Sequence, residues 1–222
     1  MVNGHYERPA ILDLAGDVRG RRILDAGCGS GPLSRALRDR GATVTGVDSS
    51  SAMLDLARRR LGDDADLRLA DLRDPLPFRA ASFDDVIASL VLHYLEDWSA
   101  PLAEMRRVLA PGGRLIAAVE HPFQSRLQAP PGTDYLAVRP WSFQWTVGGH
   151  AVTMRFWHRP LHAITDAFTA AGFRIAGIGE PPLAPGAREA FPEQAAHMSS
   201  NAFPWFLFFV LEAGSSPGPP GR

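Results

Sequence analysis

The stretch Ile23-Leu-Asp-Ala-Gly-Cys-Gly-Ser-Gly-Pro32 decides the fold of this chain. A short apolar run leads into three glycines at alternate positions, and Pro32 is a favourable first residue for a helix. A strand, a glycine-rich turn and a helix in this order open a βα unit, because glycines let the backbone turn sharply at the carboxyl edge of a sheet. By itself, the stretch predicts a turn but does not decide whether the turn binds a ligand.

The sequence around this stretch alternates short apolar runs with amphipathic segments as far as residue 120. We predict strands at residues 23–25, 43–47, 67–70, 83–90, 114–119, 173–179 and 205–212. Helices are expected from Pro32, from Ser49 or Ser50, from Ser99 and from Pro160. This alternation is typical of an α/β protein with a mainly parallel, doubly wound sheet.

Residues 121–159 interrupt the alternation. Residues 141–147 and 150–157 alternate with period two around Gly148-Gly149, which predicts a β-hairpin. We interpret residues 121–159 as an aromatic-rich cap or dimerisation arm inserted after strand five. The core would then consist of residues 1–120 and 160–212, and residues 213–222, rich in Gly and Pro, would be a disordered tail. Trp141, Trp145 and Trp157 are the candidates for contact with a substrate.

The composition of the 222 residues limits the possible functions. A formal charge of −1 gives no basic excess for nucleic acid, and the longest apolar run, from Trp205 to Leu211, is too short to span a membrane. All 23 basic residues are arginines, which excludes Schiff-base chemistry and a P-loop lysine. The single cysteine, Cys28, and the polar N-terminus lead us to expect a cytoplasmic location. No spacing of candidate ligands indicates a metal site.

Three acidic residues follow predicted strands at the edge where the glycine turn lies. Asp25 ends the first strand, Asp48 follows the second and Asp71 follows the third. A carboxylate at Asp48 can accept both hydroxyls of a ribose, and one at Asp71 can accept from the amine of adenine. Each residue alone is more often a turn or capping residue, but the set beside a glycine turn indicates an adenosine site.

The details of the turn distinguish two kinds of adenosine cofactor. A dinucleotide fingerprint needs its third glycine where this chain has Pro32, and proline has no N–H to offer a phosphate. Asp25 would repel a pyrophosphate and attract an ammonium group. A nucleoside that carries an amino acid is therefore favoured over NAD.

Residues 22–119 resemble the class I S-adenosylmethionine-dependent methyltransferases of the small-molecule type. The resemblance lies in the glycine motif, the acidic residues after strands two and three, and Ala110-Pro-Gly-Gly113. It implies S-adenosyl-L-methionine as cofactor and a Rossmann-like sheet of seven strands, the last one antiparallel. Asp25 would orient the ammonium of the cofactor, Asp48 would hold its ribose, and Asp71 would read its adenine. The other implied cofactor residues are Tyr6, Gly27, Cys28, Gly29, Gly31, Ser49, Met53, Leu72, Ser89 and Leu90.

The roles of the N-terminus and of two histidines stay open at this point. Tyr6 resembles an aromatic residue that covers the sulfonium in related enzymes, but it could equally lie on a mobile terminus. His121, directly after the fifth strand, and His93, after the fourth, are candidates for a general base. His93 could instead be a packing residue. Glu120 could orient His121 or face solvent.

Three functions are compatible with these observations. The first is methyl transfer to an oxygen, nitrogen or carbon of a small organic molecule, in bacterial specialised metabolism. The second is a protein of this fold that binds the cofactor but catalyses a non-methylating rearrangement or only binds a ligand. The third, an NAD-dependent oxidoreductase, is disfavoured by Pro32 and Asp25. We expect a small-molecule acceptor as partner, no nucleic acid and no membrane, and a homodimer if residues 121–159 form an arm.

Overall fold

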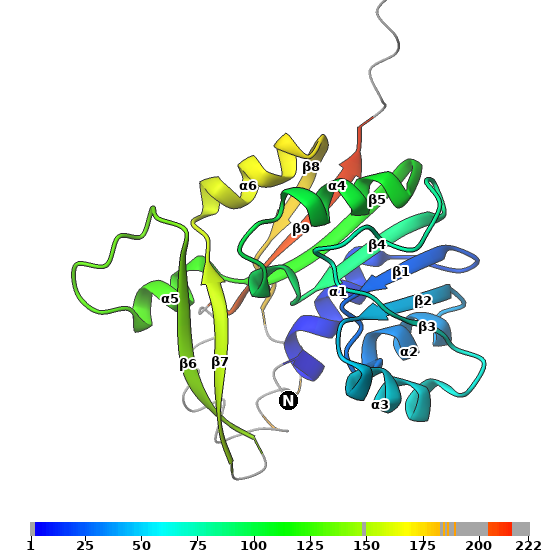
Figure 1. The fold of residues 1–222 in the computed structure, drawn as a ribbon, viewed down its shortest axis with the longest axis horizontal. Helices are drawn as coiled ribbons and strands as arrows, with labels where there is room; N and C mark the ends of the chain where they lie inside the picture. The colour runs from blue at the N-terminus through cyan, green and yellow to red at the C-terminus, as the bar shows by residue number, and fades with distance from the viewer. Residues whose placement is uncertain are drawn as a thin grey trace, which may run out of the picture.

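The computed structural model describes residues 3–147, 150–182 and 204–214, and the single positions 184, 186 and 189. Its strands form a seven-stranded sheet, in the order β3-β2-β1-β4-β5-β9-β8, and a separate ribbon of β6 and β7 (Figure 1). The strands are β1 Arg22–Ala26, β2 Thr43–Asp48, β3 Asp66–Leu69, β4 Phe83–Ser89, β5 Leu109–Glu120, β6 Arg139–Val147, β7 His150–His158, β8 Phe173–Gly179 and β9 Phe206–Ala213. The helices are η1 Asn3–Glu7 (a π-helix), α1 Arg8–Ala15, α2 Pro32–Asp39, α3 Ser51–Leu61, η2 Leu92–Tyr94 (a 3-10 helix), α4 Ser99–Val108, α5 Pro122–Gln128 and α6 Leu161–Ala170.

The large sheet has the predicted topology. Strands β3, β2, β1, β4 and β5 are parallel, and β9 runs antiparallel to both β5 and β8. This confirms the Rossmann-like, doubly wound sheet with an antiparallel last strand. The strand order reverses between β1 and β4, and open α/β sheets bind ligands at the carboxyl ends of the strands beside such a reversal.

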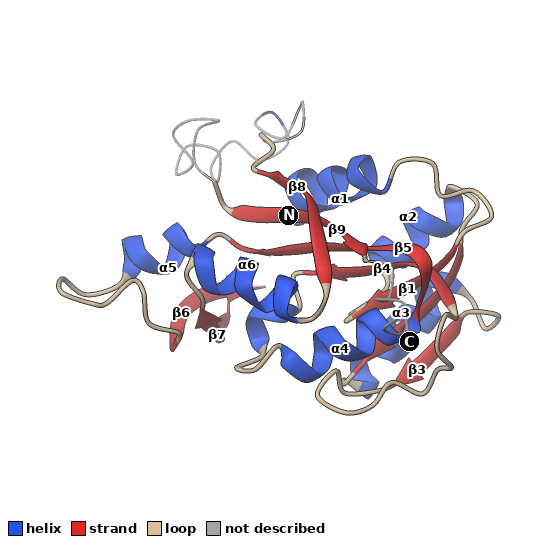
Figure 2. Cartoon of the chain, turned by 90° about the horizontal axis from the view of Figure 1, so that it is seen from above, coloured by secondary structure: helices blue, strands red, loops and turns tan. Residues whose placement is uncertain are grey.

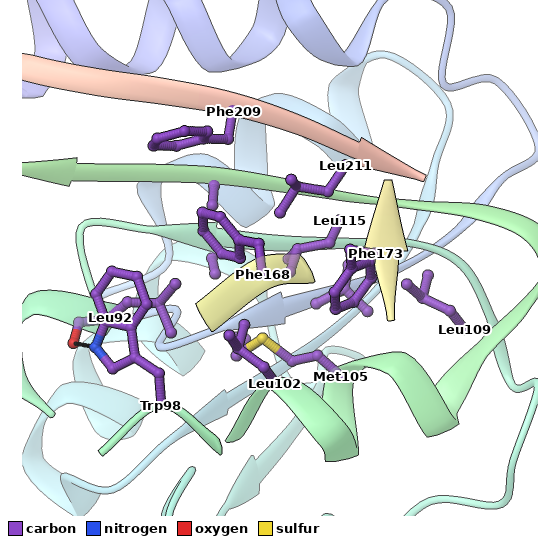
Figure 3. Close-up of a cluster of buried hydrophobic side chains, with 14 of the residues drawn as sticks. Leu92, Trp98, Leu102, Met105, Leu109, Leu115, Phe168, Phe173, Phe209 and Leu211 are labelled. Atoms are coloured by element: carbon purple, nitrogen blue, oxygen red, sulfur yellow. Dashed lines mark hydrogen bonds between the residues drawn. The ribbon is translucent and has the colours of Figure 1, made fainter. Parts of the chain in front are cut away.

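The central strands are buried on both faces, which explains their nearly continuous apolar sequences. On β5, Leu115, Ala117 and Val119 belong to one hydrophobic cluster, and Ile116 and Ala118 belong to another. The first cluster contains the buried faces of α4 and α6 and is drawn in Figure 3. The second contains those of α1 and α2. The two helix layers therefore cover opposite faces of the sheet (Figure 2).

Two of the α-helices were not expected from the sequence. The first is α1, which has Pro9 in its first turn and ends before Gly16, so a start and a stop signal were present. Its buried side chains, Ile11 among them, pack into the second cluster and hold the N-terminal segment on the sheet. The second is α5, which follows β5 directly. None of the helices within the described residues is long and apolar enough to cross a membrane.

The predicted hairpin is confirmed. Its strands β6 and β7 pair from Arg139 opposite His158 to Val147 opposite His150, and the ribbon extends away from the large sheet (Figure 1). Phe156 anchors the ribbon, because its ring lies 4.4 Å from the ring of His93 and 4.8 Å from that of Tyr94, both on η2. The predicted turn at residues 148–149, the side chain of Trp145 and tail residues 215–222 lie outside the described parts.

Candidate active site

A cavity of about 620 Å³ opens at the carboxyl ends of the parallel strands. Most of the predicted cofactor residues line it: Asp25, Gly27, Cys28, Gly29, Asp48, Ser49, Met53, Asp71, Leu72, Ser89 and Leu90. Eleven of the thirteen predicted cofactor residues therefore lie around one cavity. Tyr6 and Gly31 are not among the lining residues.

The glycine turn holds the floor of the cavity by backbone contacts. The N–H groups of Gly27 and Cys28 both donate to the carbonyl of Val47, at 2.8 and 2.9 Å, and this ties the turn to β2. Gly27 has a φ of +77°, and a Cβ there would lie 2.5 Å from Cγ2 of Val91. Only glycine fits this position. A Cβ on Gly29 would meet nothing within 4 Å, so the backbone there faces open space.

Cys28 is held in the turn as a small buried group. Burial, together with the charges of Asp25 and Asp48, raises the pKa of its thiol. The thiol is therefore protonated at neutral pH and is not an activated nucleophile. This agrees with the interpretation of Cys28 as a residue that simply fits the turn.

Asp48 and Asp71 place two carboxylates in the wall of the cavity. One oxygen of Asp48 accepts the N–H of Gly29 and the other accepts the N–H of Ser50, each at 2.9 Å. These bonds fix the carboxylate beside the turn and leave each oxygen further acceptor capacity. Asp71 forms an ion pair with Arg73 at 2.5 Å, which lowers its pKa. These bonds and the ion pair thus orient both carboxylates as acceptors for a hydroxyl or amine donor.

Asp25 and Glu7 form a second, deeply buried acidic pair. Asp25 accepts a hydrogen bond of 2.5 Å from the hydroxyl of Ser34, and burial raises its pKa to about 6. Glu7, at the end of η1, accepts a hydrogen bond from the hydroxyl of Ser89. Burial also raises the pKa of Glu7 to about 7, and Asp25 adds to this effect. Both carboxylates and Arg8 line the cavity. The two carboxylates attract a cation and Arg8 attracts an anion, so this part of the cavity suits a ligand that carries both charges.

Sequence analysis missed Glu7 and Arg8 because the N-terminus was read as a polar segment without structure. The helix signals around Pro9 and Gly16 could have placed α1, but nothing in the sequence indicates that η1 reaches Ser89. That contact joins residues 82 positions apart and exists only in the folded sheet.

Tyr6 neither lines the cavity nor lies on a free terminus. It is buried, with its ring 5.4 Å from Phe206 and 6.4 Å from Phe208 on β9. It therefore anchors η1 to the sheet and does not cover the cavity. Gly31, with φ of +78°, precedes the first residue of α2 and shapes the turn from outside the cavity wall. Leu90 lies in the wall with a φ of +52°, a strained conformation of the kind found at functional sites.

His121 has both ring nitrogens engaged. Its Nδ1 accepts the N–H of Phe123 at 3.2 Å and thereby caps α5, and its Nε2 lies 2.7 Å from a carboxylate oxygen of Glu180. Burial lowers the pKa of His121, although Glu180 acts in the opposite sense. A neutral ring that accepts at Nδ1 carries its proton on Nε2, so neither nitrogen is available to take a proton from an acceptor. This arrangement favours a structural role over the predicted one as a base.

His93 is also positioned for packing. Its Nδ1 accepts the N–H of Glu120 at 3.2 Å, and burial lowers its pKa to about 3. The imidazole is therefore neutral over the physiological range and lies edge-on to Phe156. Of the alternatives for His93, the structure supports the packing residue.

The hairpin places two of the predicted substrate tryptophans on opposite faces. Trp141 pairs directly with Phe156, so these two residues share a face of the ribbon. Trp157 follows Phe156 and therefore points to the other face. The ring centroids of Trp141 and Phe156 are 6.0 Å apart.

Glu120, the last residue of β5, is half-buried and lines a cavity of about 10 Å³ together with His121 and Arg159. Trp141 favours its charged form, although the indole N–H makes no hydrogen bond of good geometry within the described residues. Burial has the larger effect and raises the pKa of Glu120 to about 8. The partner of His121 is Glu180 instead.

The hairpin is also fixed to α5, at its strand β7. The hydroxyl of Ser125 lies 2.5 Å from Nδ1 of His158, whose Nε2 is 2.7 Å from the carbonyl oxygen of Tyr135. Ser125 and His158 are both buried. The cavity next to them measures only about 10 Å³, so this Ser–His pair has no room for a substrate and fastens β7 to α5.

A seven-stranded sheet of this order, with its last strand antiparallel, is the fold of the class I S-adenosylmethionine-dependent methyltransferases. Comparison with known proteins gives the same result. Residues 24–117 match the family described as Methyltransferase domain. The S-adenosylmethionine-dependent methyltransferase from Mesorhizobium loti superposes with a TM-score of 0.72 at 28% identity, over 96% of this chain and 100% of that one.

Curated relatives match over a part of their length. The chain is 40% identical over 106 residues to the malonyl-[acyl-carrier protein] O-methyltransferase of Serratia marcescens, which is 48% of this chain and 41% of that protein. It is 42% identical over 116 residues to the demethylmenaquinone methyltransferase of Clavibacter sepedonicus, which is 51% of this chain and 47% of that protein. The chain thus spans less than half the length of these relatives. Residues 24–117 carry the methyltransferase domain that the family model describes, and the chain as a whole has the fold of the Mesorhizobium loti S-adenosylmethionine-dependent methyltransferase.

Proposed function

We propose that this protein transfers a methyl group from S-adenosyl-L-methionine to a small organic acceptor, in bacterial specialised metabolism. The observation that carries the proposal is the cavity whose wall includes four carboxylates, those of Asp48, Asp71, Glu7 and Asp25. This donor set suits a nucleoside joined to an amino acid. When bound, the cofactor supplies a methyl group that is already activated by the positive charge on sulfur.

The chain would hold the two ends of the cofactor differently. Asp48 would accept the ribose hydroxyls, and Asp71 with the backbone of Leu72 would contact the adenine. Glu7 and Asp25 would bind the ammonium, and Arg8 would bind the carboxylate. Because burial leaves both of these acids with a raised pKa, a cation that arrives beside them restores their charged form. The cofactor thus fits the electrostatics of the cavity.

The aromatic hairpin would act as a lid over the acceptor rather than as an arm for dimerisation. Phe156 packs against Tyr94, and Tyr94 also lines the cavity, so the ribbon touches the cofactor site directly. A lid excludes water and aligns the acceptor with the methyl group, and alignment in favourable cases contributes about 7–11 kcal/mol.

Two measurements test the proposal. Calorimetric titration with S-adenosylmethionine, S-adenosylhomocysteine and NAD should give binding of the first two and no binding of NAD. Incubation with S-adenosylmethionine and a panel of amines, phenols and carboxylic acids should then release S-adenosylhomocysteine with at least one acceptor class. Binding of NAD alone would support an oxidoreductase. Cofactor binding without turnover across the panel would support the non-methylating alternative.

A further inference from the structure

Tyr94 is the only aromatic side chain among the described residues that line the large cavity. It ends η2, the short 3-10 helix that follows β4. Val91 and Leu95, from the same segment, also line the cavity and are apolar. The charged lining residues, by contrast, lie in the N-terminal segment or at the ends of β1, β2 and β3. The segment after β4 therefore gives the cavity an apolar wall with one aromatic ring.

This wall is fixed against the glycine turn. The N–H of Tyr94 donates to the carbonyl of Val91 at 3.1 Å, so the two residues belong to one turn of the chain. Val91 packs directly on Gly27, because a Cβ added to Gly27 would lie 2.5 Å from Cγ2 of Val91. Tyr94 is therefore one turn away from a residue that contacts the floor of the cofactor cavity.

The ring of Tyr94 is held by two other rings and is still half exposed. The ring centroid of Phe156 on β7 lies 4.8 Å away in an edge-to-face arrangement, and that of His93 lies 4.9 Å away. Nevertheless, 48% of Tyr94 remains exposed. An exposed ring that its neighbours immobilise offers a large contact area at little cost in conformational entropy. Such a ring suits a planar ligand that packs against it.

Aromatic rings continue from Tyr94 along the hairpin. The ring centroid of Phe156 is 6.0 Å from that of Trp141 and 5.7 Å from that of Phe143. Trp141 and Phe143 stack on each other at 5.2 Å. Tyr94 thus lies where the ring surface of the hairpin meets the cofactor cavity. An acceptor at this junction would contact both, as the transfer of a methyl group from a bound cofactor requires.

The hydroxyl of Tyr94 adds a polar group to this surface. It makes no hydrogen bond with residues 3–147, 150–182 or 204–214. Burial raises the pKa of Tyr94, and the charges of Glu120 and Asp48 act in the same direction. The hydroxyl is therefore protonated at neutral pH and is a hydrogen-bond donor. A ligand can accept this bond without displacing a partner among the described residues.

We propose that the methyl acceptor is a planar aromatic molecule that packs against the ring of Tyr94, and that the Tyr94 hydroxyl donates a hydrogen bond to an oxygen or nitrogen of this molecule. The inference rests on the proposed methyl transfer. Tyr94 selects the acceptor by its shape and by one polar contact. A saturated molecule of the same size loses the contact between rings, and an aromatic hydrocarbon loses the hydrogen bond.

The test uses the full chain saturated with S-adenosylhomocysteine and two probes that have no group to be methylated. Coumarin is planar and aromatic and carries a carbonyl oxygen. Octahydrocoumarin has the same two rings and the same carbonyl but is saturated. The variants are Tyr94→Phe, Tyr94→Leu and, as a matched control, Phe123→Leu, because Phe123 is 51% exposed on α5 and does not line the cavity. Calorimetry measures the affinity for each probe, after titration with S-adenosylhomocysteine has established that each protein is folded.

We expect wild-type protein to bind coumarin about threefold to tenfold more tightly than octahydrocoumarin, because contact between aromatic rings adds to the burial of apolar area. Tyr94→Leu should abolish this preference. Tyr94→Phe should keep the preference and weaken the binding of both probes by about threefold or more, which is the effect of one lost hydrogen bond. Phe123→Leu should leave both affinities unchanged.

Wild-type protein that binds the two probes equally, or binds neither of them, would overturn the inference, and this result requires no variant. An unchanged preference in Tyr94→Leu would also overturn it, because the ring would then not be the contact. The same holds for Tyr94→Phe with unchanged affinity for both probes, because the hydroxyl would then make no bond.

The experiment also separates this inference from the function on which it rests. Wild-type protein that fails to bind S-adenosylhomocysteine contradicts the proposed methyl transfer together with the aromatic acceptor. Binding of S-adenosylhomocysteine by all four proteins, with probe binding that does not depend on Tyr94, contradicts only the aromatic acceptor.

Discussion

The buried carboxylate of Glu7 makes the stability of the protein depend on pH. Its pKa is raised from 4.5 to about 7 in the folded state, so between these values the folded protein binds more protons than the unfolded chain. Stability therefore falls as the pH rises through this range. One pKa unit corresponds to about 1.4 kcal/mol, and the difference between 4.5 and about 7 costs about 3 kcal/mol above pH 7.

Replacing Glu7 by Gln removes this cost and keeps an acceptor for the hydroxyl of Ser89. Glu7→Gln should raise the free energy of unfolding by up to about 3 kcal/mol at pH 8 and by less than about 1 kcal/mol at pH 5. Urea denaturation of both proteins at the two pH values measures the effect. Asp13→Asn, at an exposed position of α1, is the control and should change little. Equal stability of Glu7→Gln and wild type at pH 8 would refute the reasoning.

The same substitution should have the opposite effect on the cofactor. A charge-assisted hydrogen bond contributes about 1.5–3 kcal/mol, so Glu7→Gln should weaken S-adenosylmethionine binding by about tenfold to a hundredfold. Calorimetry at pH 8 measures this, because wild-type Glu7 is then mostly charged. A variant that is more stable yet binds the cofactor as tightly as wild type would show that Glu7 does not contact the ammonium.

Three further substitutions test the remaining assignments. Asp48→Ala should weaken cofactor binding by about 1.5–3 kcal/mol in calorimetry, and unchanged affinity would remove its ribose role. Gly27→Ala should destabilise the protein by at least about 2 kcal/mol in denaturation, since it adds backbone strain and a contact with Val91; Val91→Ala in the same chain should recover part of this. His121→Ala should lower stability by about 1–2 kcal/mol through the lost cap and leave turnover at saturating acceptor within about twofold. Lost turnover without lost stability would instead restore His121 as the base.

The sheet and most of the cofactor site could be predicted because their signals are local. A strand and its following turn are encoded together, so Asp25, Asp48 and Asp71 could be placed at strand ends without knowing the strand order. Parallel strands then bring these ends to one edge. The hairpin was equally local, since its alternation and turn lie within one short segment.

The electrostatic partners could not be predicted, because they join distant segments. Glu7 meets Ser89 across 82 positions, and His121 meets Glu180 across 59. The sequence places His121 at a strand end but does not show that both of its nitrogens are engaged. For Glu120 it left two possibilities, and in the structure the residue is half-buried at the end of β5, where burial raises its pKa.

The central claim is that four carboxylates at the strand ends hold a nucleoside bearing an amino acid, and a crystal structure of the protein grown with S-adenosylhomocysteine tests it most directly. We predict adenine beside Asp71, ribose hydroxyls on Asp48, and the ammonium within hydrogen-bonding distance of Glu7 or Asp25. Density for the ligand with its amino-acid end away from Glu7 and Asp25, or outside this cavity, would contradict the account.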